Sequence, residues 1–237
     1  MLGRFLELSL PAPRILESWQ WYQRIGFAPA TDREVWSHRY AVVTDGRIAV
    51  GLHDTALDRP WLTWVRPGLA AQVAKLEARG VGFEDLALGD ERFHEARFMT
   101  PDGHGGRLLE ARTYSMPAES PHVPLGWFEE LALPVRDLGA ARDYWERIGF
   151  VAAAEGNEPW PWLALTSDSV SIALHVTTAF EGPALVFSNE DLGPLLPRLE
   201  TLGVEPERRL PRALDPTRHL WLRSPEGTTL WVAPPAS

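Results

Sequence analysis

The feature that most constrains this chain is an internal repeat. Residues 5–27 align without gaps to residues 128–150, and nine of the 23 positions are identical, where average residue usage gives roughly one or two. The same offset of 123 residues recurs between residues 76–81 and residues 199–204. A constant offset across distant segments indicates duplication, so we expect two copies of one folding unit.

The repeat also sets the expected domain boundaries. We predict a first domain over residues 1–115, a linker over residues 116–126 and a second domain over residues 127–237. The linker contains three prolines, a composition typical of connecting segments. With 237 residues, of which 45% are hydrophobic, the chain can fill the cores of two domains of ordinary size.

Within each copy, the pattern predicts a strand, a helix and three strands, and then the same order again. Alternating residues at Glu7–Leu10 and Glu130–Leu133 indicate half-buried strands. In the second copy, Asp137 is a good helix N-cap and is followed by apolar residues at helical spacing. Asp45-Gly46 is a strong hairpin signal. We therefore expect an α+β fold.

The second half of each copy opens with a strand, at Trp61–Val65 and at Ala184–Phe187. A helix is expected next, over residues 69–79 in the first copy and near residues 192–202 in the second. Pro197 should kink the second of these helices or limit it to a short stretch.

Composition excludes several classes of function. A net charge of −9 without clustered basic residues argues against nucleic-acid binding. The absence of cysteine rules out disulfides, thiolate metal sites and a cysteine nucleophile. No apolar stretch approaches the ~18 residues of a membrane span, and neither a phosphate loop nor a Gly-x-Ser-x-Gly elbow occurs. We expect a soluble, cytoplasmic protein without nucleic-acid or membrane partners, either a monomer or a homodimer.

The ends of the predicted first helices and the last turns carry a resemblance to a known family. The segments WYQRIGF and YWERIGF look like the first-helix ending of the vicinal oxygen chelate (glyoxalase/bleomycin-resistance/dioxygenase) superfamily, and TPDGHGG and SPEGTT look like its last turn. The match covers almost the whole chain, twice. It implies tandem βαβββ half-units that form two glyoxalase-like domains with curved mixed sheets, and a function that resides in the cup of each sheet.

The resemblance also implies where a metal would be held. Metalloenzymes of the family place His, Gln or Glu on the first strand, His on the first strand of the second half-unit and Glu on the last strand, with open positions for substrate oxygens. Here the first-strand positions are Glu7 and Glu130, and Glu110 lies near the last-strand position of the first copy. The cofactor is therefore expected to be either none or a divalent metal at Glu7, Glu110 or Glu130.

The remaining family positions lack metal ligands. By resemblance, the second position falls near Pro60 in the first copy and Ala184 in the second. The last-strand position of the second copy falls on Trp231. The resemblance therefore implies an incomplete set of ligands.

Aromatic residues and two histidines are the candidates for binding a ligand. The chain contains 11 tryptophans, and several fall on predicted strands, where aromatic walls suit a planar or apolar molecule. His53 and His175 end equivalent strands, as ligands, bases or hydrogen-bond partners, or as ordinary rim residues. Core packing is the alternative for the tryptophans. The predicted ligand-binding residues are His53, Trp64, Trp162, His175, Phe187 and Trp231.

These observations lead to three hypotheses of function. The preferred one is a protein of the sequestration or resistance type that binds a small aromatic or apolar molecule in an aromatic-lined cup without a full metal triad. The alternative is a divalent-metal-dependent lyase, isomerase or dioxygenase. The third is a structural or regulatory module whose cups are filled by their own side chains.

Overall fold

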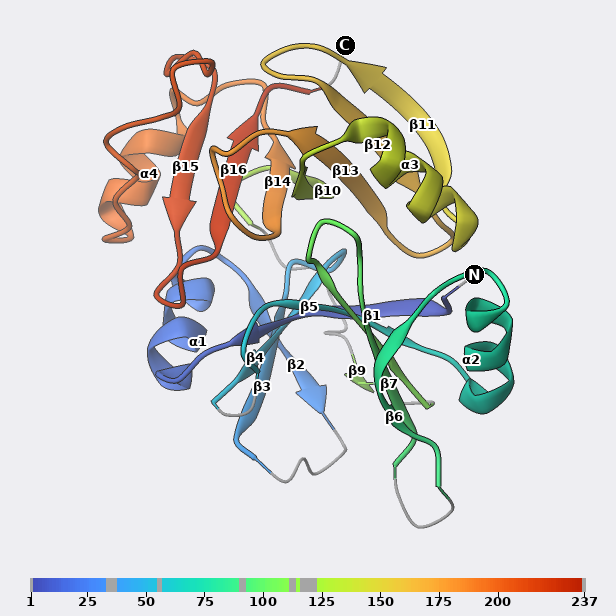
Figure 1. The fold of residues 1–237 in the computed structure, drawn as a ribbon. Helices are drawn as coiled ribbons and strands as arrows, with labels where there is room; N and C mark the ends of the chain where they lie inside the picture. Colours follow the sequence, from blue (N-terminus) through green and yellow to red (C-terminus); the bar gives the residue numbers. More distant parts are fainter. Residues whose placement is uncertain are drawn as a thin grey trace.

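The computed structural model describes residues 2–32, 38–54, 57–89, 93–110, 114–115 and 123–235. These residues form two modules, each built on one sheet, and Figure 1 shows the two curved sheets with their helices. Most of the predicted linker, residues 116–122, lies outside the described residues. The predicted domain boundaries therefore stay a prediction.

The first module has a mixed sheet in the order β6-β7-β8-β5-β1-β4-β3-β2-β9. The opening strands of its two half-units, β1 and β5, lie side by side in the middle of the sheet and run antiparallel. Its elements are β1 (Arg4–Pro11), α1 (Ile15–Arg24), β2 (Ala28–Asp32), β3 (Tyr40–Thr44), β4 (Ala49–His53), β5 (Trp61–Val65), α2 (Leu69–Glu77), β6 (Phe83–Ala87), β7 (Glu95–Met99), β8 (Gly105–Leu109) and β9 (Tyr114–Ser115).

The second module repeats this plan with the sheet order β11-β12-β13-β10-β14-β16-β15. Its last half-unit has two strands after its helix, where each half-unit of the first module has three. The elements are β10 (Trp127–Val135), α3 (Leu138–Arg147), β11 (Val151–Gly156), β12 (Trp162–Thr166), β13 (Ser171–Val176), β14 (Ala184–Ser188), α4 (Leu195–Thr201), β15 (Leu220–Arg223) and β16 (Thr229–Ala233). The predicted α+β fold with curved mixed sheets is confirmed.

Local sequence explains where the helices begin. The side chain of Asp137 accepts a hydrogen bond from the Ala140 N–H at 2.9 Å, so the predicted N-cap starts α3. α4 is shorter than the predicted helix because it begins only at Leu195, which leaves Pro197 in its first turn. Proline is tolerated there because the first N–H groups of a helix have no intrahelical partner.

The helices cover one face of each sheet, and this face holds the main core. Strand residues such as Leu8, Leu10, Leu131 and Leu133 point toward the helices and are fully buried. The buried cluster to which they belong contains residues of both modules and runs without interruption between them. In the described part of the chain, no helix has the length and apolar composition needed to cross a membrane.

Candidate functional site

A β-bulge at the same place in both modules directs a glutamate away from the helices. In the pairing of β1 with β5, Phe5 lies opposite Trp64 but Glu7 lies opposite Thr63, so one extra residue is inserted in β1. The pairing of β10 with β14 has the same shift between Phe128 and Glu130. A bulge changes which face the following side chains occupy. Glu7 and Glu130 therefore lie on the faces opposite the helices, here called the first and second inner faces.

Strand register defines the neighbours of each glutamate. Thr63 lies opposite both Glu7 and Arg107, which makes Glu7, Thr63 and Arg107 a row across β1, β5 and β8. The equivalent row in the second module is Glu130, Val186 and Trp231. Glu7 thus shares its row with neither Pro60 nor Glu110, and Glu130 shares its row with Trp231 and not with Ala184.

Glu7 is the centre of a buried polar network on the first inner face. Its side chain is 1% exposed, and Oε1 accepts hydrogen bonds from the Ser9 hydroxyl at 2.6 Å and from His53 Nε2 at 3.2 Å. The Tyr40 hydroxyl donates to Oε2. Ser9 is also hydrogen-bonded to Thr63 at 2.7 Å. Both carboxylate oxygens are thus held by neighbouring side chains.

This network keeps Glu7 ionised. Burial raises the pKa of Glu7, but the hydrogen bond and charge of His53 and the hydroxyl groups of Ser9 and Tyr40 outweigh burial and leave the pKa below its ordinary value. Space for the carboxylate comes from Gly51 on the adjacent β4, because a methyl group there would overlap the Glu7 carboxyl group. A glycine is therefore required beside Glu7.

The network continues from Glu7 toward the edge of the first inner face. His53 is 1% exposed, and its Nδ1 lies 2.9 Å from Nε2 of the half-buried His38. The Tyr40 ring stacks at a tilt on His53, with the ring centroids 4.5 Å apart. A carboxylate followed by two imidazoles forms a hydrogen-bonded chain along which a proton can move.

Charged and aromatic groups lie beside the network. Arg107 forms a bidentate ion pair with Glu95, with both N–O distances 2.9 Å. The guanidinium carbon of Arg97 lies 5.8 Å from the centroid of the Trp61 ring. The indole N–H of Trp61 is buried without a hydrogen-bond partner in the described residues. The first inner face thus combines balanced charges with an aromatic ring.

The second inner face is packed with its own side chains. It carries a separate hydrophobic cluster whose rings contact one another, for example Trp160 and Trp231 with centroids 5.7 Å apart. Two of its strands contribute Trp221 and Trp231, and loops contribute Phe180 and Leu214. The buried members are Ala132, Trp160, Phe180, Ala184, Val186, Leu214, Trp221 and Trp231.

The predicted site residues of the second module belong to this packing or lie beside it. His175 is 3% exposed, accepts a hydrogen bond from the Trp160 indole at 2.8 Å and has its Nε2 3.8 Å from Glu130. Glu130 is 20% exposed, so it is less buried than Glu7. The Trp162 indole donates to the Glu158 carbonyl and covers Gly156. Trp231 donates to His219 at 3.2 Å.

Three other predicted site residues lie away from the inner faces. Trp64 and Phe187 are at most 1% exposed and belong to the core on the helix side, which places them on the face opposite Glu7 and Glu130. The bulges explain this, since they reverse the alternation that sequence alone suggests. The Glu110 carboxylate accepts hydrogen bonds from the N–H groups of Gly68 and Leu69 at 2.6 and 2.8 Å, and these bonds lower its pKa. It therefore caps α2.

The donor sets do not fit the metal site that the resemblance implies. In the first row a hydroxyl and a guanidinium accompany Glu7, and in the second an isopropyl group and an indole accompany Glu130. Guanidinium is a permanent cation without a lone pair to donate, so it opposes a divalent metal. Among the described residues, no group of three or more His, Asp or Glu side chains is arranged to hold a metal ion.

Several residues of the Glu7 network escaped the sequence analysis. Ser9 follows Glu7 by two residues and thus shares its face, a signal that periodicity could have provided. Gly51 precedes His53 by the same spacing. Thr63, Tyr40 and His38 come from other segments, and only the strand register and tertiary contacts bring them to Glu7.

Comparison with known proteins gives matches at the level of structure. No family model and no curated protein matches the sequence. The fold is similar to that of a catechol 2,3-dioxygenase (TM-score 0.65, 15% identity, covering 100% of this chain and 90% of that chain). It is also similar to homoprotocatechuate 2,3-dioxygenase from Arthrobacter globiformis (TM-score 0.66, 11% identity, 99% and 80% covered).

A third similar structure is 2,2',3-trihydroxybiphenyl 1,2-dioxygenase from Sphingomonas wittichii (TM-score 0.64, 14% identity, 99% of this chain and 91% of that chain). All three are named for a dioxygenase activity, the class of our enzymatic alternative. At this level of identity the likeness establishes the fold. The chain therefore has the fold of these dioxygenase structures, built from the tandem half-units that its repeat and its turns predicted.

Proposed function

We propose that this chain binds a small hydroxylated aromatic molecule on the first inner face, with Glu7 as the anchor and without a metal triad. The observation that carries the proposal is the buried, ionised Glu7 carboxylate, which a bulge directs out of the core. An ionised carboxylate forms strong hydrogen bonds with hydroxyl groups, so a ligand hydroxyl can take the place of the Ser9 or Tyr40 hydroxyl that holds Glu7 in this structure. Glu130, the equivalent residue of the second module, lies beside packed aromatic rings, so we assign the second inner face a structural role.

Electrostatics favours binding over catalysis by Glu7 as a general base. A base works best when its pKa lies near the operating pH. The pKa of Glu7 lies below its ordinary value, so the carboxylate has little tendency to take a proton. The Glu7 carboxylate is better suited to accept a hydrogen bond that orients a ligand.

The neighbours on the first inner face support an aromatic ligand. Trp61 is 3% exposed, and it can stack on an aromatic ligand that displaces the neighbouring Arg97; its N–H, which has no hydrogen-bond partner among the described residues, can then donate to that ligand. The ion pair of Arg107 with Glu95 leaves the local charge balanced, which suits a neutral ligand. Catechol is a hydroxylated aromatic ring, and one of the similar structures is named for it. We therefore use catechol as the probe.

A titration of tryptophan fluorescence with catechol tests the proposal. Wild-type protein should show saturable quenching, and Glu7→Gln should weaken binding about tenfold or more, because a charge-assisted hydrogen bond contributes about 1.5–3 kcal/mol. Glu130→Gln is the matched control from the second module and should bind as wild type. Equal loss in both variants, or unchanged affinity in Glu7→Gln, would contradict the proposal.

The alternative function is a divalent-metal-dependent enzyme, favoured by the dioxygenase names of the similar structures. Glu7 and His53 are the adjacent groups that could contribute ligands, with Oε1 and Nε2 3.2 Å apart. Elemental analysis after purification with added Fe²⁺ or Mn²⁺, together with oxygen uptake on catechol, separates the two functions. Stoichiometric metal that is lost in Glu7→Gln would replace our proposal with this alternative.

A further inference from the structure

Two equivalent turns, one in each module, have the same backbone design. The first joins β7 to β8 over Thr100–His104, and the second joins β15 to β16 over Ser224–Thr228. In both, the first residue donates its N–H to the carbonyl of the last, at 2.9 and 3.0 Å. The hydroxyl of the first residue accepts from the N–H of the last at 3.0 Å in each turn. Position by position, His104 corresponds to Thr228.

Each turn reaches across to the other module, but only the first does so with the side chain of its last residue. His104 is 6% exposed, and its Nε2 lies 2.7 Å from the carbonyl oxygen of Pro134 at the end of β10. Burial lowers the pKa of His104, so the imidazole is neutral and donates this bond. Thr228 faces the equivalent strand end, at Pro11, with a side chain too short to repeat the contact.

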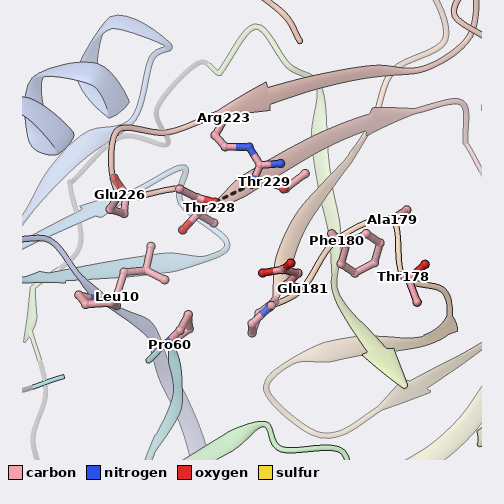
Figure 2. Close-up of a pocket in the computed structure, with 14 residues that line it drawn as sticks. Leu10, Pro60, Thr178, Ala179, Phe180, Glu181, Arg223, Glu226, Thr228 and Thr229 are labelled. Carbon is pink, nitrogen blue, oxygen red and sulfur yellow. Dashed lines mark hydrogen bonds between the residues drawn. The ribbon is translucent and has the colours of Figure 1, made fainter. Parts of the chain in front are cut away.

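A cavity of about 520 Å³ lies between Thr228 and Pro11, where no described side chain makes the contact that His104 makes in the first turn, and both residues line it. In Figure 2, Leu10 and Pro60 of the first module lie on one side of this space and Phe180 and Glu181 of the second module on another. We name it the junction cavity. Its volume falls within the range of about 300–1,000 Å³ that is typical of sites for small organic molecules.

The charged groups around the junction cavity leave negative charge unbalanced. Arg223 donates to the Gly227 carbonyl at 3.0 Å and lies 3.4 Å from Glu207, so its charge is compensated. Glu181 has no ion pair within the described residues. Glu226 accepts from the Tyr22 and Ser224 hydroxyls through Oε1, and its Oε2 is buried without a donor among the described residues. The unpaired, exposed Glu181 carboxylate therefore favours a ligand that carries a positive charge.

We propose that the junction cavity binds a small organic cation, a primary ammonium on an apolar body. The apolar body packs between Phe180 on one side and Leu10 and Pro60 on the other. The ammonium group is held by the carboxylate of Glu181 at the edge of the cavity. This site is separate from the Glu7 network and does not depend on the function proposed for it.

Isothermal titration of the full chain with three probes of one shape tests the proposal. Benzylamine carries the ammonium group, benzyl alcohol is neutral and benzoate is an anion. Benzylamine should bind with one-to-one stoichiometry, at least tenfold more tightly than benzyl alcohol, and benzoate should give no binding. Absence of benzylamine binding, or equal binding of benzoate, would overturn the proposal.

Variants locate the binding. Thr228→His restores the side chain that His104 provides in the other turn, so it should reduce benzylamine affinity at least tenfold while the thermal midpoint stays equal or rises. Glu181→Gln alters an exposed side chain without disturbing the fold and should also weaken binding. Glu7→Gln should leave benzylamine binding unchanged. Full affinity in Glu181→Gln, or in a folded Thr228→His, would refute the site.

Discussion

The two inner faces have a glutamate at the same position, but the side chains around it are polar in the first module and mostly apolar in the second. In the first, Ser9, Tyr40, Gly51 and Thr63 surround Glu7, and three of them hold it or its neighbours by hydrogen bonds. Their second-module equivalents, by strand register, are Ala132, Trp162, Ala173 and Val186. Of the neighbours compared by strand register, only the histidine is the same in both modules, as His53 in the first and His175 in the second.

The comparison shows that position on a fold does not fix the role of a carboxylate. Ala173 carries a methyl group where Gly51 leaves room, so Glu130 cannot settle into the sheet surface as Glu7 does. Without hydroxyl donors, burial of a carboxylate is unfavourable. The second inner face instead gains stability from packed rings, a difference that substitutions in matched pairs can test.

The largest expected effect on stability comes from a substitution on the second inner face. Trp231→Ala removes a ring that is 4% exposed and contacts Trp160 and His175, and it should lower the free energy of unfolding by about 3–5 kcal/mol. Urea denaturation followed by circular dichroism measures this. A much smaller loss would mean that the second inner face is an open binding cup and not a packed one.

A smaller effect is expected from the glycine beside Glu7. Gly51→Ala places a methyl group against the carboxyl group and should cost about 1–3 kcal/mol, together with loss of catechol binding. The reciprocal change, Ala173→Gly, should cost only about 0.5–1 kcal/mol, the usual effect of glycine within a strand. Equal values for the two variants in the same urea assay would show that Glu7 is not confined by Gly51.

The smallest effect is a difference in acid sensitivity. The folded-state pKa of Glu7 lies below the ordinary value of 4.5, so the unfolded chain binds more protons as the pH falls below that value. The stability that Glu7 contributes is complete above about pH 5 and is lost as the pH falls through the folded-state pKa. Wild-type protein should therefore lose stability more steeply than Glu7→Gln between pH 5.5 and pH 3.5, and parallel curves would contradict this.

Sequence reasoning predicted the architecture well because duplication, alternation and capping are local patterns. The strand at Trp61–Val65 and the Asp137 cap are found as expected. The site was harder to predict because a bulge has no clear sequence signal, yet it decides whether Trp64 or Thr63 shares a face with Glu7. The sequence also could not show that Glu110 binds the start of α2, because that contact spans 42 residues.

The buried cluster on the helix side belongs to both modules at once. The rings of Phe27 in the first module and Phe187 in the second meet at 6.2 Å, and Tyr22 bonds to Glu226 across the junction. Separating the two halves would expose apolar surface on each of them to water. The duplicated chain has thus become one thermodynamic unit, in which damage to either half weakens the other, and a ligand bound by one half stabilises both.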